Sequence, residues 1–192
     1  WSSDVCSSDL IPAWNSTTQL LMTNCDVWRE SVFDKLSSLN AKYIFVAGTS
    51  GFATIDATGN VVTGQAREDI WRAGMTETLG KLLSNSSKVF YLADYPIGTT
   101  DPLNCLSHSK NLSSCVIPLD KAINFDWLQL EHDVATQNGA IFVDATELIC
   151  ETDPCAPISG NLLKYRDAGH LTATFAKSLY SQLYRQLKEN LN

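Results

Sequence analysis

The chain has 192 residues, of which 44% are hydrophobic and 18% charged, and these proportions are typical of one globular domain rather than a disordered segment. Its formal net charge of -7 and the lack of a Lys/Arg cluster argue against a nucleic-acid partner, because phosphate binding needs a basic surface. No apolar run in the sequence approaches the roughly 20 residues that a membrane-spanning helix needs.

The first ten residues, "WSSDVCSSDL", differ from the rest of the sequence. They lack the basic start and the apolar centre of a signal peptide. They resemble the translated adapter sequence found at the ends of metagenomic reading frames. We therefore expect residues 1–10 to be foreign, and residues 11–192 to be one domain that is incomplete at its N-terminus. On this interpretation Cys6 has no role, and the odd Cys25 suggests a partner that has been cut away.

From Cys25 onward, predicted helices and strands alternate along the chain. Residues 25–39, 68–83 and 119–139 carry apolar side chains at helical spacing, including Trp28, Trp71 and Trp127, which we expect in the core. A closing helix repeats an apolar residue every four positions from Leu171 to Leu187. The strands are predicted at "KYIFVAG" (42–48), "KVFYLAD" (88–94) and "AIFVDAT" (140–146).

Strands separated by helices predict an α/β fold with a parallel sheet covered on both faces. Each predicted strand is a continuous apolar run, as burial on both faces requires. The expected architecture is therefore a three-layer α/β/α, flavodoxin-like domain. In such sheets, ligands bind beyond the carboxyl ends of the strands.

Four cysteines bracket two short polar loops. Cys105 and Cys115 enclose "LSHSKNLSS", and Cys150 and Cys155 enclose "ETDP". Neither pair has the doubled C-x-x-C spacing of a zinc site, so we predict two disulfides, with buried free thiols as the alternative. Disulfides indicate an oxidising compartment outside the cytoplasm.

The segment "YRDAGHLT" (165–172) places Asp167 three residues before His170, in a loop that precedes the closing helix. A histidine there can act as a general base, and a nearby carboxylate can fix its tautomer. Alternatively, Asp167 satisfies backbone N–H groups of the turn and His170 is half-buried. From these residues alone, both interpretations stay open.

The other polar residues near the strand ends are predicted to be structural. Asp94 and Asp144 end strands and are expected to orient loops, while His108 and His132 are expected to be exposed. No metal site is predicted.

The α/β alternation that ends in Tyr165-x-Asp167-x-x-His170-Leu171-Thr172 resembles the last block of the SGNH hydrolase superfamily. More narrowly, the chain is similar to the extracytoplasmic SGNH domain of bacterial acyltransferase-three O-acetyltransferases, which modify peptidoglycan, lipopolysaccharide or other surface glycans. "CDVW" (25–28), "YIFVAG", "DYP" (94–96) and "FVDATELIC" (142–150) support this resemblance. It covers roughly residues 20–188.

The resemblance implies that Asp167 and His170 are the aspartate and histidine of a Ser-His-Asp site. The serine of this family lies in a Gly-Asp-Ser block after the first strand, and no such tripeptide occurs in the chain. We therefore expect the first strand and the nucleophile to be missing, and the chain alone to be inactive. The oxyanion position maps to Gly48, Thr49 and Ser50, where the family's asparagine is absent. Ser50 as the nucleophile is disfavoured, since "GTSG" lacks the G-x-S-x-G pattern.

The resemblance further implies an acyl donor delivered by a membrane acyltransferase domain, a glycan acceptor, and no metal or organic cofactor. The location is then periplasmic or at the cell surface, with the whole protein tethered to the membrane. Two alternatives remain: a secreted carbohydrate esterase that deacetylates glycans, and a non-catalytic glycan-binding domain on the same fold.

Overall fold

The computed structural model describes residues 13–15, 20–21, 23–49, 53–56, 58–97 and 101–191. The chain divides into two compact units, and each is described by itself. Unit 1 comprises Trp1–Asp94 and Asp126–Val143, and unit 2 comprises Tyr95–Phe125 and Asp144–Asn192.

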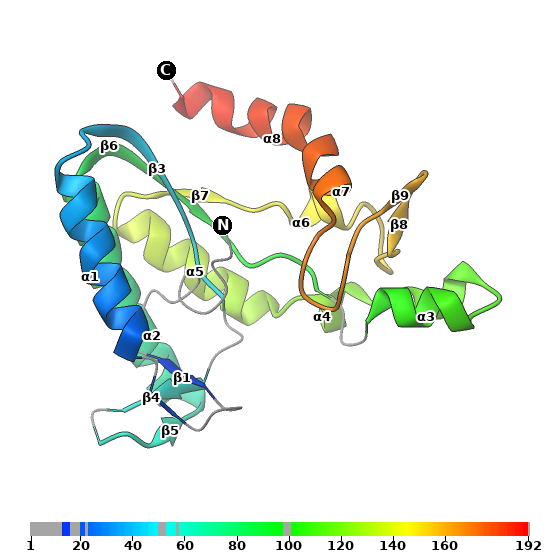
Figure 1. Ribbon diagram of the computed structural model, residues 1–192, viewed down its shortest axis with the longest axis horizontal. Helices are drawn as coiled ribbons and strands as arrows, with labels where there is room; N and C mark the ends of the chain where they lie inside the picture. The colour runs from blue at the N-terminus through cyan, green and yellow to red at the C-terminus, as the bar shows by residue number, and fades with distance from the viewer. Residues whose placement is uncertain are drawn as a thin grey trace. The chain divides into compact units, whose positions relative to one another are not determined.

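A parallel three-stranded sheet organises unit 1 (Figure 1). The strands are β3 (Ala41–Ala47), β6 (Ser86–Leu92) and β7 (Ile141–Val143), in the order β3-β6-β7. The helices are α1 (Thr23–Ser37), α2 (Gly64–Ser84) and α5 (Phe125–Gln137). Ile44 pairs with Val89, and Tyr91 pairs with Phe142. The α/β class and the parallel sheet that the sequence predicts are confirmed.

The core of unit 1 lies between the three helices and one face of this sheet. Alternate residues of the strands face the helices, because side chains in a strand point to opposite faces in turn. The core includes Phe33, Trp71, Met75, Leu79, Trp127, Leu130 and Val134 from the helices, and Ile44, Val89 and Tyr91 from the strands. Trp71 and Trp127 are buried, as predicted, with their rings 5.1 Å apart edge to face.

Strand β3 is not buried on both faces, contrary to expectation. Phe45 points away from the core side of its neighbour Ile44 and is 51% exposed, with its ring stacked at 4.6 Å on the buried ring of Phe90. Within the described residues, β3 is an edge strand: it pairs with β6 on one side, and no further strand pairs with its other side. An edge strand is covered less than a central one. A continuous apolar run therefore overstates how deeply this strand is covered.

The buried face of α1 differs from the predicted one. Phe33 is in the core and Leu36 packs against it, whereas Trp28 is 39% and Leu39 is 54% exposed. At 3.6 residues per turn, Trp28 lies at the rim of the face that Phe33 and Leu36 occupy, and Leu39 lies beyond the end of α1. Cys25, on the same helix, is buried and disulfide-bonded. The expectation that the partner of Cys25 has been cut away is therefore wrong, because Cys25 is bonded within this chain; Cys6 lies outside the described residues.

A small antiparallel sheet in unit 1 was not predicted. It consists of β2 (Leu20–Leu21), β1 (Ala13–Asn15), β4 (Ala53–Ile55) and β5 (Val61–Val62), in that order. The turn between β4 and β5 follows "DATGN", where Asp56 Oδ1 accepts hydrogen bonds from the N–H groups of Thr58 and Asn60. Gly59 supplies the positive φ of 85° that this turn requires. Strands of two or three residues are too short for alternation to be visible in the sequence.

Unit 2 is built from short elements between longer loops (Figure 1). In chain order these are α3 (Pro102–His108), η1 (Leu112–Cys115), α4 (Leu119–Ala122), α6 (Thr146–Ile149), β8 (Ile158–Ser159), β9 (Leu162–Leu163), α7 (Ala173–Ser178), α8 (Tyr180–Leu187) and η2 (Lys188–Asn190). None of the helices in the described part of the chain has the length and apolarity to span a bilayer.

The closing helix is divided rather than continuous, with α7 ending and α8 beginning around Leu179. A repeat of four residues advances by about 40° per step around a straight helix, so such a stripe does not stay on one face. Phe175 and Leu187 are buried from this stripe, whereas Tyr180 and Tyr184 are exposed.

Both predicted disulfides are present in unit 2. Cys105 is bonded to Cys115, and Cys150 is bonded to Cys155. The two loops are joined by backbone hydrogen bonds in both directions between Ile117 and Cys155, at 2.9 and 2.7 Å. The disulfides therefore brace one continuous region instead of two separate loops.

Candidate active site

The loop that carries Asp167 and His170 is a tight hairpin in unit 2. Tyr165 and Leu171 form an antiparallel bridge, and the N–H of Arg166 donates to the carbonyl of His170 at 2.9 Å. Thr172 ends the hairpin and caps α7, since its hydroxyl accepts a hydrogen bond from Phe175 N at 3.2 Å. The sequence thus turns back on itself within five residues, which brings Asp167 and His170 to the same tip.

Asp167 and His170 are in direct contact. Nδ1 of His170 lies 2.8 Å from Oδ1 and 3.0 Å from Oδ2 of Asp167. Oδ1 also accepts a hydrogen bond from Gly169 N at 2.9 Å. Burial of the carboxyl opposes ionisation, but the hydrogen bonds from Gly169 and His170 outweigh it and lower the pKa of Asp167. The predicted pair is therefore assembled, with an ionised carboxylate on the Nδ1 side of the ring.

The geometry leaves the other ring nitrogen, Nε2, available. The side chain of His170 is 62% exposed, and Nε2 has no hydrogen-bond partner within the described residues. With Nδ1–H donated to the carboxylate, Nε2 carries the lone pair that a general base uses. Arg166 Nε lies 3.4 Å from Asp167 Oδ2 and adds a positive group beside the carboxylate.

Side chains from other parts of unit 2 hold this hairpin. The hydroxyl of Tyr95 donates to the carbonyl of Gly169 at 2.8 Å, and that of Tyr165 donates to the carbonyl of Pro96 at 2.8 Å. Lys164 is buried, and its Nζ donates to the carbonyl of Ile149 at 2.6 Å. Burial raises the pKa of Tyr165 to about 12 and lowers that of Lys164.

Sequence reasoning missed Tyr95 and Lys164. "DYP" was noted as a motif, and its tyrosine and proline are the two residues that contact the hairpin. The burial of Lys164 could not be predicted from the sequence, because lysines are mostly exposed and nothing in the neighbouring residues marks this one as buried.

The predicted oxyanion residues fall in unit 1. Gly48 is buried, and Thr49 Oγ1 lies 3.4 Å from Asp94 Oδ2; Ser50 lies outside the described residues. They belong to a different unit from His170. The assignment of Gly48, Thr49 and Ser50 therefore stays a prediction.

A buried carboxyl lies close to Thr49 and Asp94 in unit 1. Glu131 is fully buried, accepting hydrogen bonds from the Tyr91 hydroxyl at 2.8 Å and from Asp94 N at 3.2 Å. Burial, together with the nearby charge of Asp94, raises the pKa of Glu131 to about 7 despite these hydrogen bonds. Its signal in the sequence is its position four residues after Trp127, on the buried stripe of α5.

The remaining polar residues are structural, as expected. Asp144 Oδ1 accepts a hydrogen bond from Thr146 N at 2.8 Å, in the turn that precedes α6. His108 and His132 are exposed; Nδ1 of His108 contacts the carbonyl of Asn104, and Nδ1 of His132 contacts Asp133. In the part of the chain that the structure describes, no three His, Cys, Asp or Glu side chains are grouped to hold a metal ion.

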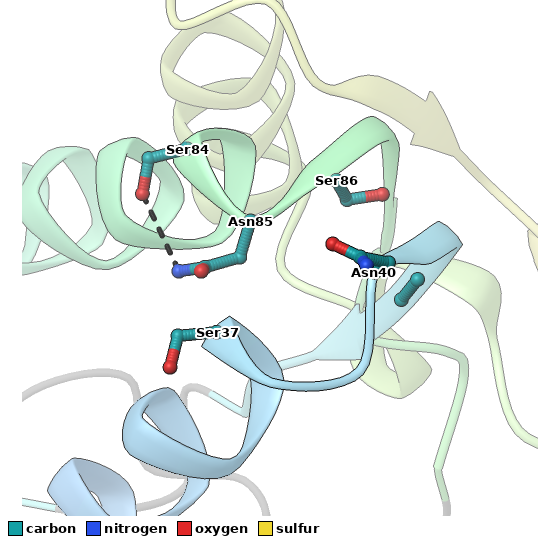
Figure 2. Close-up of a pocket in the computed structure, with 6 residues that line it drawn as sticks. Ser37, Asn40, Ser84, Asn85 and Ser86 are labelled. Carbon is teal, nitrogen blue, oxygen red and sulfur yellow. Dashed lines mark hydrogen bonds between the residues drawn. The ribbon is translucent and has the colours of Figure 1, made fainter.

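In unit 1, a polar pocket of about 340 Å³ lies at the amino end of the parallel sheet, where β3 and β6 begin (Figure 2). It is lined by Ser37, Asn40, Ala41, Ser84, Asn85 and Ser86. Ser37 and Ser84 donate to carbonyls of their own helices, and Asn85 Nδ2 contacts the hydroxyl of Ser84. The residues that line this pocket include no His, Asp or Glu that could serve as a general base.

Comparison with known proteins gives a family and a structural neighbour for the chain. The family model "SGNH domain (fused to AT3 domains)" matches residues 4–185. The periplasmic domain of a lipopolysaccharide acetyltransferase from Salmonella ser. Paratyphi A has a similar structure, with a TM-score of 0.63 and 12% identity. The match covers 96% of this chain and 69% of that one. No curated protein sequence matches significantly. Because the family model spans nearly the whole chain, the protein belongs to the family of SGNH domains that are fused to AT3 domains.

Proposed function

We propose that this chain is the extracytoplasmic SGNH domain of an O-acyltransferase that acetylates a cell-surface glycan. The observation that carries the proposal is the contact of His170 Nδ1 with both carboxylate oxygens of Asp167, with Nε2 left open. An aspartate in this position fixes the tautomer that makes Nε2 basic and stabilises the imidazolium that forms when Nε2 takes a proton.

The proposed reaction has two acyl transfers. A serine hydroxyl gives its proton to His170 Nε2 while its oxygen attacks the donor's acetyl carbonyl, and the donor's leaving group then takes that proton. The resulting acetyl-serine is attacked by a sugar hydroxyl, whose proton passes to His170 and then to the serine oxygen as the ester breaks. Asp167 remains ionised throughout, which agrees with its lowered pKa.

The serine is proposed to lie in sequence that precedes this chain. Residues 1–192 contain no Gly-Asp-Ser block. Gly48, Thr49 and Ser50 are proposed as the oxyanion position on the resemblance alone, and they offer backbone N–H groups where the family has an asparagine.

Transfer is favoured over hydrolysis by the family itself. Its members are fused to AT3 domains, so a membrane acyltransferase domain is the proposed source of the acetyl group. A glycan acceptor and a periplasmic or cell-surface location are proposed by analogy with the structurally similar lipopolysaccharide acetyltransferase domain. The two disulfides of unit 2 fit an oxidising compartment.

The test is the O-acetyl content of the surface glycan in cells that make the whole protein. Replacing the general base by His170→Ala is expected to lower acetylation at least 100-fold, which is the usual contribution of acid–base catalysis. His132→Ala is the matched control, because His132 is also exposed and contacts an aspartate, and it should leave acetylation unchanged. Equal acetylation in the His170→Ala strain would show the assignment to be wrong.

We also propose that the chain alone does not turn over acetyl esters, because a base without its nucleophile retains little catalysis. Hydrolysis of an acetyl ester by residues 1–192 that disappeared in Ser50→Ala would contradict this and make Ser50 the nucleophile.

A further inference from the structure

The Asp167–His170 contact is too exposed to hold itself in place. The side chains of His170 and Asp167 are 62% and 44% exposed. Pairs this open to water hold each other only weakly, because water competes for both partners. Catalysis nevertheless requires the imidazole ring of His170 in a defined orientation. The backbone around His170 therefore has to hold the ring in that orientation.

Gly169, the residue immediately before His170, is held on both sides of its Cα. Gly169 N donates to Asp167 Oδ1 at 2.9 Å, and the carbonyl of Gly169 accepts the Tyr95 hydroxyl at 2.8 Å. The first bond lies within the hairpin and moves with it, whereas the second comes from a residue 74 positions away. Because glycine permits many backbone conformations, the Gly169–His170 peptide would rotate easily without this outside contact.

Tyr95 is itself well anchored within unit 2. Its ring packs against the cluster of Ile149, Tyr165 and Phe175. The next residue, Pro96, is buried, and its carbonyl accepts the hydroxyl of Tyr165. A residue before proline is also restricted to extended conformations. The Tyr95 hydroxyl therefore has a fixed position in unit 2, and its hydrogen bond to the Gly169 carbonyl holds the hairpin tip in place.

We propose that Tyr95 is a positioning residue for His170: its hydrogen bond to the Gly169 carbonyl fixes the peptide that aims the imidazole at Asp167. The structural part of this inference stands on the contacts above, and its catalytic consequence rests on the proposed function.

The test reads the tautomer of His170 by ¹⁵N NMR at about pH 9, where imidazoles are neutral. The chain has three histidines, so the signals are assigned with single variants. His170 is expected to be mainly Nδ1–H in the parent chain, with Asp167→Asn abolishing this preference. Tyr95→Phe removes only the hydroxyl, and the ratio of Nδ1–H to Nε2–H should fall about fivefold, the usual value of one hydrogen bond.

Two further variants separate positioning from general loosening. Phe175→Leu weakens the same cluster without touching the hairpin tip, and it should leave the tautomer ratio unchanged. Gly169→Ala, added to Tyr95→Phe, should restore part of the ratio by stiffening the peptide, because a Cβ at Gly169 meets no atom within 4 Å. An unchanged ratio in Tyr95→Phe, or an equal fall in Phe175→Leu, overturns the proposal.

The same variant in the whole protein connects positioning to catalysis. Tyr95→Phe should lower kcat about fivefold with little change in KM, because the bond orders the base and does not touch substrate. If Tyr95→Phe alters the tautomer while His170→Ala keeps full acetyl transfer, the positioning inference stands and the proposed function fails. If His170→Ala abolishes transfer while Tyr95→Phe leaves the tautomer ratio unchanged, the proposed function stands and the positioning inference fails.

Discussion

Glu131→Gln should change how the stability of the protein depends on pH. Glu131 is fully buried in unit 1, and burial raises its pKa from 4.5 to about 7. Its folded form therefore binds a proton more tightly than its unfolded form. The resulting stabilisation is fully present below pH 4.5 and is lost as the pH rises through about 7.

The magnitude follows from the size of that pKa shift. A rise from 4.5 to about 7 corresponds to about 3 kcal/mol of unfolding free energy lost between acid and neutral pH. Glutamine cannot ionise, so this loss should disappear in Glu131→Gln. The amide accepts only one of the two hydrogen bonds that Tyr91 and Asp94 N donate, which lowers stability by an amount that does not vary with pH.

The assay is urea unfolding followed by circular dichroism at several pH values from about 4.5 to 8. The stability of the parent chain minus that of Glu131→Gln should fall by about 3 kcal/mol across this range. Glu147→Gln, which removes an exposed carboxylate, is the control and should leave the parent's pH dependence in place. A constant difference between parent and Glu131→Gln would refute the reasoning, because it would mean that Glu131 is already ionised in the folded protein at pH 5.

Two further predictions concern the stability of unit 2. Replacing Cys105 and Cys115 by serine should lower the unfolding free energy by about 2–3 kcal/mol, since the disulfide closes a loop of 10 residues; chemical denaturation measures this, and a loss under 0.5 kcal/mol would argue against the disulfide. Thr172→Ala removes the cap of α7 and should cost about 1 kcal/mol, whereas Thr174→Ala, at an exposed position in the same helix, should cost less than half as much.

The parallel sheet and its helices were predictable because each element leaves a strong periodic signal. The strands at 41–47 and 86–92 are long apolar runs, and Trp127 and Val134 mark the buried face of α5. The antiparallel strands were not predictable, since two or three residues cannot display a period. Trp28 was misplaced because a tryptophan at the rim of a helix face fits the spacing of a buried stripe as well as one at its centre.

In the candidate site, the Asp167–His170 pair was predictable from the sequence, but the contacts that hold it in place were not. Asp167 and His170 are close in sequence, so a tight hairpin brings them together and local reasoning finds them. Tyr95 is 74 positions from the carbonyl it holds, and Glu131 is 37 positions from the N–H it accepts. Such contacts are set by tertiary packing, which no local pattern encodes. The disulfides, in contrast, were predicted because each closes a short loop.

The central claim is that Asp167 and His170 form the base of a serine acyl-transfer site. The most direct measurement is the rate at which a serine-reactive phosphonate labels the whole protein, with the modified residue located by mass spectrometry. The account predicts one labelled serine in a Gly-Asp-Ser block, labelled at least 100-fold more slowly in His170→Ala and at the parent rate in His132→Ala. A Gly-Asp-Ser serine that never labels, or that labels equally fast without His170, would contradict it.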